Sequence, residues 1–368
     1  MAGTSGRLAS GPVPSPVVHE LFSSLDLQPL VAGQLDWVAG IYRINRTVGE
    51  WQAYFANPVN DPELTLTLVH EMHHFLQISS LSYLHRFASL LYYSVAEVVR
   101  SYYDDLSALP PTLPMNDAVR DAVWDLQWRE PDGVSVLDIV ESLTYFVEVN
   151  TEAPVRTSAY VAQLDEADDL PEEYKRGFLH AFELSGRHGD LAALFEIICH
   201  LSLCSGAPRA CLSMLAEGVR SGDVHANMTF DQIVTHCEQH DPDHWGFAWD
   251  WRQRLGGAVP QHPVFGSLET ALDNQTMYVN FVRYMLSPHQ SFEPFLQLAL
   301  APPILFNAYP AGAAAGFDEW PLDVGLALRD ATPEQKRSEG TWCLYMASAS
   351  RKYLDALGTP PSTLRSRA

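Results

Sequence analysis

Residues 61–77 read DPELTLTLVHEMHHFLQ, a strong helix start followed by three histidines in an apolar run. Asp61 can accept hydrogen bonds from the first free amides, Pro62 suits the first helical position, and Glu63 lies near the positive end of the helix dipole. Apolar residues then recur at spacings of three and four through residue 99, which predicts one long helix or two consecutive helices. The histidines therefore lie about two turns inside a helix.

His70 and His74 are four positions apart, so a helix places both imidazoles on the same face, with Glu71 at the edge of that face. This is the H-E-x-x-H pattern, in which two histidines bind a metal ion and the glutamate reaches a metal-bound water. His73 points away from the pair and is expected to be a hydrogen-bonded residue rather than a ligand. The alternative is a solvated, histidine-rich helix face. The apolar residues on both sides of the pattern favour a buried helix, where unpaired imidazoles would be costly.

A metal ion needs a third protein ligand, because two histidines leave it half coordinated. Residues 133–150, GVSVLDIVESLTYFVEVN, have helical spacing, and Asp138, Glu141, Tyr145 and Glu148 form one polar stripe on that helix. A carboxylate near the middle of the stripe could approach the histidine pair from this second helix. Tyr145 would then donate a hydrogen bond to a bound substrate or oxyanion.

The segments HEMHHFLQ and ESLTYFVE resemble the gluzincin group of zinc metallopeptidases, in which H-E-x-x-H on one helix is completed by a glutamate on a later one. The resemblance implies that His70, His74 and Glu141 bind the metal and that Glu71 is the general base. It further implies a zinc-dependent hydrolase acting on a peptide or amide.

Three other carboxylates are alternatives to Glu141 as third ligand, in the order Glu148, Glu97 and Glu196. Glu196 and His200 are four apart on a predicted helix that begins near Asp190, where they could orient a ligand or satisfy each other.

A further histidine group, His236, His240 and His244, follows near residue 240 in THCEQHDPDHWGFAWDW. Pro242 interrupts the helix that a ligand pair would need there, so a loop or helix end is expected.

If the ion is Zn²⁺, it lowers the pKa of a bound water towards about 7, and Glu71 takes the proton as the water attacks a carbonyl. The same two histidines and one carboxylate also describe the site of a non-haem Fe²⁺ oxygenase, which could modify a peptide or small molecule. A di-iron carboxylate site would need a second E-x-x-H, and none is found. A third reading is a non-catalytic helical protein with a structural or vacant metal site.

The composition restricts the partners. The formal net charge of −22 disfavours nucleic acid and anionic membrane surfaces, so a peptide or small-molecule substrate is expected. Five cysteines without a C-x-x-C pair argue against a disulfide framework, and with no export signal they favour the cytoplasm. No nucleotide-binding or serine-hydrolase motif is present, and nothing in the sequence indicates an oligomeric state.

The predicted architecture is mainly α-helical with little or no β-sheet. We expect one large helical domain over residues 19–358, with a sub-boundary near 256–266 and flexible tails at 1–18 and 359–368. The apolar segment 301–316, rich in Gly, Pro and Ala, is expected to cover the pocket.

Overall fold

The described part of the chain is mainly helical, which confirms the predicted fold class. The computed structural model describes residues 33–37, 41–44, 50, 53–54, 61–101, 117–152, 155–240 and 304–306. Its long helices are α3 (Pro62–Ser80), α4 (Ser82–Ser101), α5 (Asp117–Gln127), α6 (Val136–Glu152), α7 (Thr157–Glu166), α8 (Glu172–Leu184), α9 (Leu191–Cys204), α10 (Pro208–Ser221) and α11 (Phe230–His240). The expected tails, the sub-boundary near 256–266 and all of segment 301–316 except 304–306 lie outside the described residues.

Three short strands form one small sheet. They are β1 (Gly33–Asp36), β2 (Ile41–Ile44) and β3 (Ile304–Phe306). β1 and β2 are antiparallel, with Gly33 opposite Ile44, whereas β2 and β3 are parallel, with Tyr42 opposite Ile304. The sheet is small enough that the prediction of little β-structure holds.

Helix α3 begins where the sequence predicts. The Asp61 side chain accepts a hydrogen bond from the Leu64 amide at 2.9 Å, and Pro62 is the first helical residue. Leu81 has an extended backbone (φ −100°, ψ 118°) and separates α3 from α4, while its amide still donates to the Gln77 carbonyl. The long apolar stretch therefore forms two consecutive helices.

Helix α6 is the centre of the described core. Ser135 and Asp138 cap its start reciprocally, because the Ser135 amide donates to the Asp138 carboxylate and the Asp138 amide donates to the Ser135 hydroxyl. Every residue from 138 to 150 is buried, and α6 packs against α3, α8 and α9. The aromatic part of this core contains Phe146, Tyr160, Phe178 and Phe195.

A glycine brings α8 close to α6. A β-carbon on Gly177 would lie 2.7 Å from the Asp138 carbonyl oxygen and 2.8 Å from the Ser142 β-carbon. The Gly177 amide donates to the Ser142 hydroxyl at 2.8 Å. Only a residue without a side chain permits this approach, and it carries Tyr174, one turn earlier on α8, towards α3.

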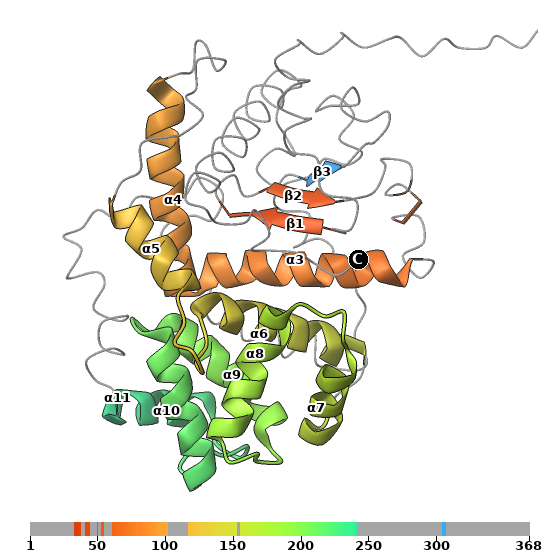
Figure 1. Cartoon of the computed structure of the whole chain (residues 1–368), viewed down its shortest axis with the longest axis vertical. Helices are drawn as coiled ribbons and strands as arrows, with labels where there is room; N and C mark the ends of the chain where they lie inside the picture. Colours follow the sequence, from red (N-terminus) through yellow and green to blue (C-terminus); the bar gives the residue numbers. More distant parts are fainter. Residues whose placement is uncertain are drawn as a thin grey trace, which may run out of the picture.

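Figure 1 shows α3 between the small sheet on one side and helices α6 to α10 on the other. β1 and α6 both contact α3, so its buried histidine-bearing segment is covered from two sides.

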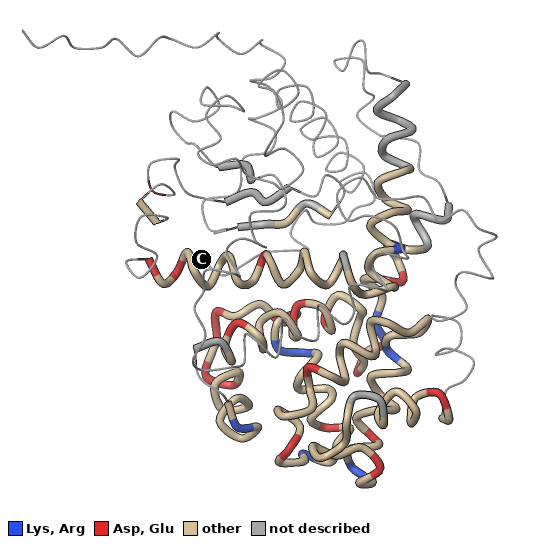
Figure 2. Tube along the Cα trace, turned by 180° about the vertical axis from the view of Figure 1, so that it is seen from behind, with Lys and Arg blue, Asp and Glu red and all other residues tan. Residues whose placement is uncertain are grey.

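Acidic residues are spread over the helices beneath α3 with fewer basic ones among them (Figure 2). None of the helices in the described part of the chain combines the length and apolar character that crossing a bilayer requires.

Candidate metal centre

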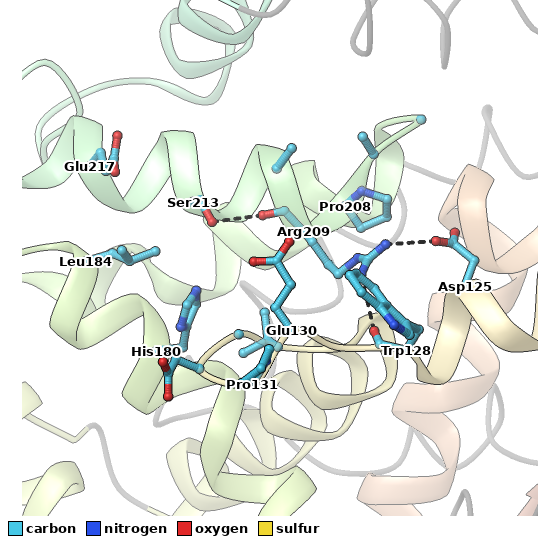
Figure 3. A pocket seen from close by; sticks show the side chains of 16 residues that line it. Asp125, Trp128, Glu130, Pro131, His180, Leu184, Pro208, Arg209, Ser213 and Glu217 are labelled. Atoms are coloured by element: carbon cyan, nitrogen blue, oxygen red, sulfur yellow. Dashed lines mark hydrogen bonds and ion pairs between the residues drawn. The ribbon is translucent and has the colours of Figure 1, made fainter.

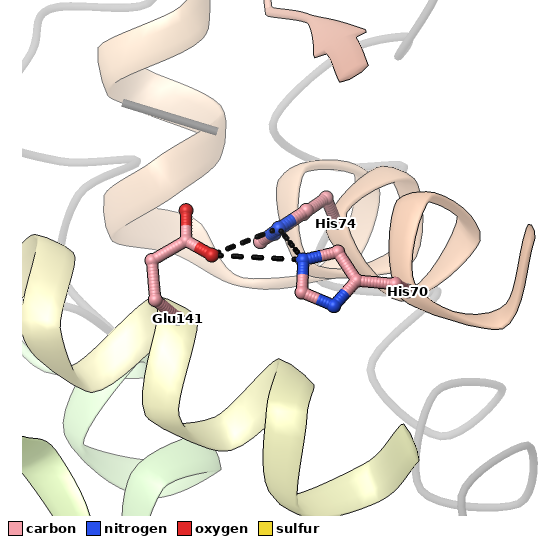
Figure 4. A group of neighbouring side chains, drawn as sticks. All are labelled: His70, His74 and Glu141. Atoms are coloured by element: carbon pink, nitrogen blue, oxygen red, sulfur yellow. Dashed lines mark hydrogen bonds and ion pairs between the residues drawn. The ribbon is translucent and has the colours of Figure 1, made fainter. Parts of the chain in front are cut away.

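Three side chains from two helices converge on one point. His70 and His74 of α3 bring their Nε2 atoms to 3.2 Å from each other. The Oε2 atom of Glu141, on α6, lies 3.3 Å from His74 Nε2 and 3.7 Å from His70 Nε2 (Figure 4). Within the described ranges, these residues are the one group of potential ligands close enough to share a metal ion.

Hydrogen bonds on the far side of each imidazole fix which nitrogen carries the proton. His70 Nδ1 lies 3.1 Å from the carboxylate of Glu148, which only accepts. His74 Nδ1 lies 3.0 Å from Gln77 Oε1, and the Gln77 amide nitrogen donates to the Val140 carbonyl, which orients the amide oxygen towards His74. Both Nδ1 atoms therefore donate, so in the neutral form of each imidazole the Nε2 atom would present a lone pair to the common point.

Two Nε2 atoms and a carboxylate this close together require a positive charge between them, either a metal ion or a proton. All three side chains are at most 1% exposed, and among the described residues Glu141 has no hydrogen-bond partner apart from the two imidazoles. Ligand atoms around a tetrahedral zinc ion, with bonds of about 2.0–2.1 Å, lie about 3.3 Å apart. Separations of 3.2, 3.3 and 3.7 Å fit that arrangement, so the residues suit a small divalent ion.

Protons compete with a metal ion for the imidazoles and the carboxylate of this cluster. Burial lowers the pKa of His70, but the carboxylates of Glu141 and Glu148 outweigh it and raise that pKa to about 10. Burial raises the pKa of Glu141, but His74 and His70 lower it by more, so it lies below its usual value. In the absence of metal, a proton on the imidazole pair supplies the charge that the cluster needs.

Glu71 lies beside the cluster and is held by the sheet. Its Oε2 accepts a hydrogen bond from the amide of Leu35 in β1 at 2.6 Å, whereas its Oε1 is buried and has no hydrogen-bond partner among the residues that the structure describes. Burial raises the pKa of Glu71, and the nearby His70 and His74 lower it only in part. One carboxylate oxygen is thus fixed and the other is available to take a proton.

Tyr174 is a site residue that the sequence analysis did not find. Its hydroxyl lies 3.5 Å from His70 Nε2, and its ring stacks on the imidazole with centroids 5.4 Å apart. Burial, with Glu141 and other nearby carboxylates, raises the pKa of Tyr174 well above its usual value, so the hydroxyl keeps its proton. No spacing rule relates a tyrosine on α8 to histidines about one hundred positions earlier, and only the packing of α8 on α6 brings them together.

Tyr145, the expected donor, lies behind Tyr174. The Tyr145 ring meets the Tyr174 ring edge-on at 5.8 Å, and its hydroxyl accepts a hydrogen bond from Gln163 at 3.5 Å. Its role as a donor stays a prediction.

His73 points away from the cluster, as expected, and its Nδ1 lies 3.1 Å from the Thr144 hydroxyl. That hydroxyl donates to the Val140 carbonyl, so it accepts from the imidazole. Burial lowers the pKa of His73 well below its usual value, which keeps it neutral.

The alternative third ligands lie in different places. Glu148 contacts the outer nitrogen of His70, and Glu196 and His200 are on α9, outside the three-residue group. His236 and His240 stack on each other at the end of α11, with ring centroids 4.0 Å apart. The side chain of Glu97 and all of His244 lie outside the described residues.

The structure describes four of the cysteines, and all four are buried: Cys199, Cys204, Cys211 and Cys237. Comparison of the chain with protein-family models, with curated proteins and with solved structures found no match.

Proposed function

We propose that the protein is a metal-dependent hydrolase that uses His70, His74 and Glu141 to hold a zinc ion and cleaves a peptide or amide bond. The observation that carries the proposal is the meeting of two imidazole Nε2 atoms and a buried carboxylate at one point. The pattern resembles that of gluzincin metallopeptidases in two short segments, the one around His70 and His74 and the one around Glu141.

The donor set supports an open, catalytic site rather than a closed structural one. Structural zinc has four protein ligands and often includes cysteine, whereas two histidines and one carboxylate leave a position for substrate. When bound, the ion supplies a Lewis acid that polarises a carbonyl and makes water more acidic.

Glu71 is suited to the proton transfers of hydrolysis. Water adds to the carbonyl carbon, the carbon–nitrogen bond breaks, and a carboxylic acid and an amine leave. Glu71 takes a proton from the water through its unpaired Oε1 and returns it to the leaving nitrogen. The Leu35 amide holds the other oxygen, so the carboxylate keeps its orientation through both transfers.

Tyr174 takes the role of oxyanion donor in this proposal, because its hydroxyl lies 3.5 Å from the ligand atom His70 Nε2. A protonated phenol at this position can donate to the oxygen on which negative charge develops. Tyr145 packs behind Tyr174 and supports its orientation.

The second candidate is a non-haem Fe²⁺ oxygenase, which the same two-histidine, one-carboxylate donor set favours. Hydrolysis uses a general base to take a proton from water, and Glu71 supplies a carboxylate for this role. The unpaired Oε1 of Glu71 therefore favours hydrolysis over oxygenation.

The test is the metal content of protein purified without added metal. We expect about one zinc per chain in the wild type, loss of the metal in His74→Ala and Glu141→Gln, and retention in Glu71→Gln. His85→Ala is the matched control, because His85 is also fully buried but belongs to α4 and lies outside the ligand group. It should keep the zinc even if its stability falls.

Activity is measured on a mixed peptide pool by mass spectrometry, with oxygen uptake measured in parallel. Hydrolysis by the wild type and none by the metal-loaded Glu71→Gln variant supports the proposal. Bound iron with oxygen uptake selects the oxygenase instead. Equal, negligible metal in the wild type and His74→Ala overturns both, and leaves a non-catalytic protein.

A further inference from the structure

A second polar feature of the molecule is a pocket of about 650 Å³, away from the metal centre. It lies between the segment that follows α5, the second half of α8 and the start of α10 (Figure 3). None of the three candidate ligands, nor Glu71 or Tyr174, lines it. Its chemistry is therefore independent of the proposed hydrolysis.

The one arginine of the pocket lining is already neutralised. Arg209 donates to the Asp125 carboxylate at 3.0 Å and to the Trp128 carbonyl at 3.2 Å. Its guanidinium also lies over the Trp128 ring, 4.6 Å from the centroid. Arg209 and Asp125 thus cancel in charge and form one wall of the pocket, in which Arg209 occupies one face of the Trp128 ring.

The remaining charges are all negative. Glu130, Asp132 and Glu217 line the pocket, are exposed, and have no hydrogen bond or ion pair through their carboxylates within the described residues. Burial lowers the pKa of His180, the pocket's histidine, so it adds no positive charge at neutral pH. The pocket therefore carries three uncompensated negative charges.

The walls between these carboxylates are apolar. Pro131, Leu184 and Pro208 line the cavity, and Trp128 is 38% exposed at its edge. Trp124, one turn earlier on α5, is 67% exposed. These two tryptophans are the large hydrophobic side chains that the described part of the chain leaves exposed, and Trp128 is the one that lines the pocket.

We propose that this pocket binds an organic cation, an ammonium or guanidinium group on a short apolar stem, with its charge among Glu130, Asp132 and Glu217. The stem lies against the proline and leucine walls. A basic side chain of a peptide and a free polyamine share this chemistry, and the two are separated by the probes below.

The test is calorimetric titration of the full chain at 0.15 M salt with spermidine and with N-acetyl-glycyl-arginyl-glycine amide. N-acetyl-glycyl-citrullyl-glycine amide is the neutral control, because citrulline has the shape of arginine without its charge and acetylation removes the N-terminal ammonium. The variant is the double substitution Glu130→Gln with Glu217→Gln. Its matched control is Glu166→Gln with Glu238→Gln, which removes the same charge at exposed positions outside the pocket.

We expect a cationic probe to bind the wild type, the citrulline peptide not to bind, and the pocket double variant to bind on the order of tenfold more weakly. The control double variant should bind as the wild type does. Asp132→Asn should weaken binding by itself, which gives a second readout through the third carboxylate. Binding of the arginine peptide alone identifies a peptide as the source of the cation, and binding of spermidine alone identifies a polyamine.

Two results overturn the proposal. One is no binding of either cationic probe to the folded wild type. The other is equal weakening in the two double variants, which would mean that the net charge of the protein, and not the pocket, attracts the probe. The His74→Ala variant should bind as the wild type does, so failure of the metal centre leaves this test intact.

Discussion

Replacing Gly177 by alanine tests the contact that brings α8 into the candidate site. At an exposed helix position, glycine to alanine stabilises a protein by about 1 kcal/mol, because alanine is the better helix former. Here the new β-carbon would meet the Asp138 carbonyl oxygen at 2.7 Å and the Ser142 β-carbon at 2.8 Å. Both distances are too short for a carbon atom, and both neighbours belong to buried α6.

The packing cost decides whether Gly177→Ala raises or lowers the free energy of unfolding. Forcing one extra carbon into a close-packed contact costs about 1–3 kcal/mol. Moving α8 also lengthens the 2.8 Å hydrogen bond from the Gly177 amide to Ser142, which contributes about 0.5–1.5 kcal/mol. After subtracting the gain in helix propensity, we expect Gly177→Ala to lower the free energy of unfolding by about 1–3 kcal/mol.

Urea denaturation followed by circular dichroism measures this change. Gly218→Ala, in α10, is the control, because its β-carbon first meets a side-chain methyl of Val224 at 2.8 Å rather than a backbone atom. Its destabilisation should be smaller. Gly177→Ala should also weaken zinc binding, since α8 carries Tyr174 and presses on the turn of α6 that holds Glu141. A variant that is as stable as the wild type or more so would show that α8 does not lie this close to α6.

Three further predictions test the outer contacts of the centre and the start of α3. Gln77→Leu removes the acceptor of His74 Nδ1 and should weaken zinc binding by about 10- to 100-fold in a chelator competition; unchanged affinity would exclude Gln77 as a positioning residue. Burial lowers the pKa of His70, but its neighbouring carboxylates raise it to about 10, above an unfolded value of about 6.5. The proton on His70 therefore stabilises the metal-free protein fully below about pH 6.5, and this contribution is lost as the pH rises through 10. Because zinc must displace this proton, zinc affinity should rise about tenfold per pH unit between 7 and 9. The metal-free protein should lose thermal stability over the same range. A zinc affinity that does not depend on pH would contradict the role of the His70 proton. Asp61→Ala removes the cap on the Leu64 amide and should cost about 0.5–2 kcal/mol in urea denaturation, with no loss expected if the cap is dispensable.

The sequence determined the local features of this protein. Asp61 and Pro62 fix the start of α3, and apolar spacing of three and four predicts the helices on either side of the break at Leu81. The same regularity placed His70 and His74 on one helix face. These signals act within one or two turns of chain, and helix periodicity and end-capping are local enough to be recognised from a single sequence.

Only the tertiary structure decided which groups surround the histidines. The polar stripe on residues 138–148 left several carboxylates as candidates, and the packing of α6 on α3 placed Glu141 at the inner nitrogens and Glu148 at an outer one. The Leu35 amide beside Glu71 depends in the same way on the position of β1. Tyr174 reaches His70 because Gly177, one turn later, lets two helices touch, and a contact between helices distant in sequence has no periodicity from which it could be inferred.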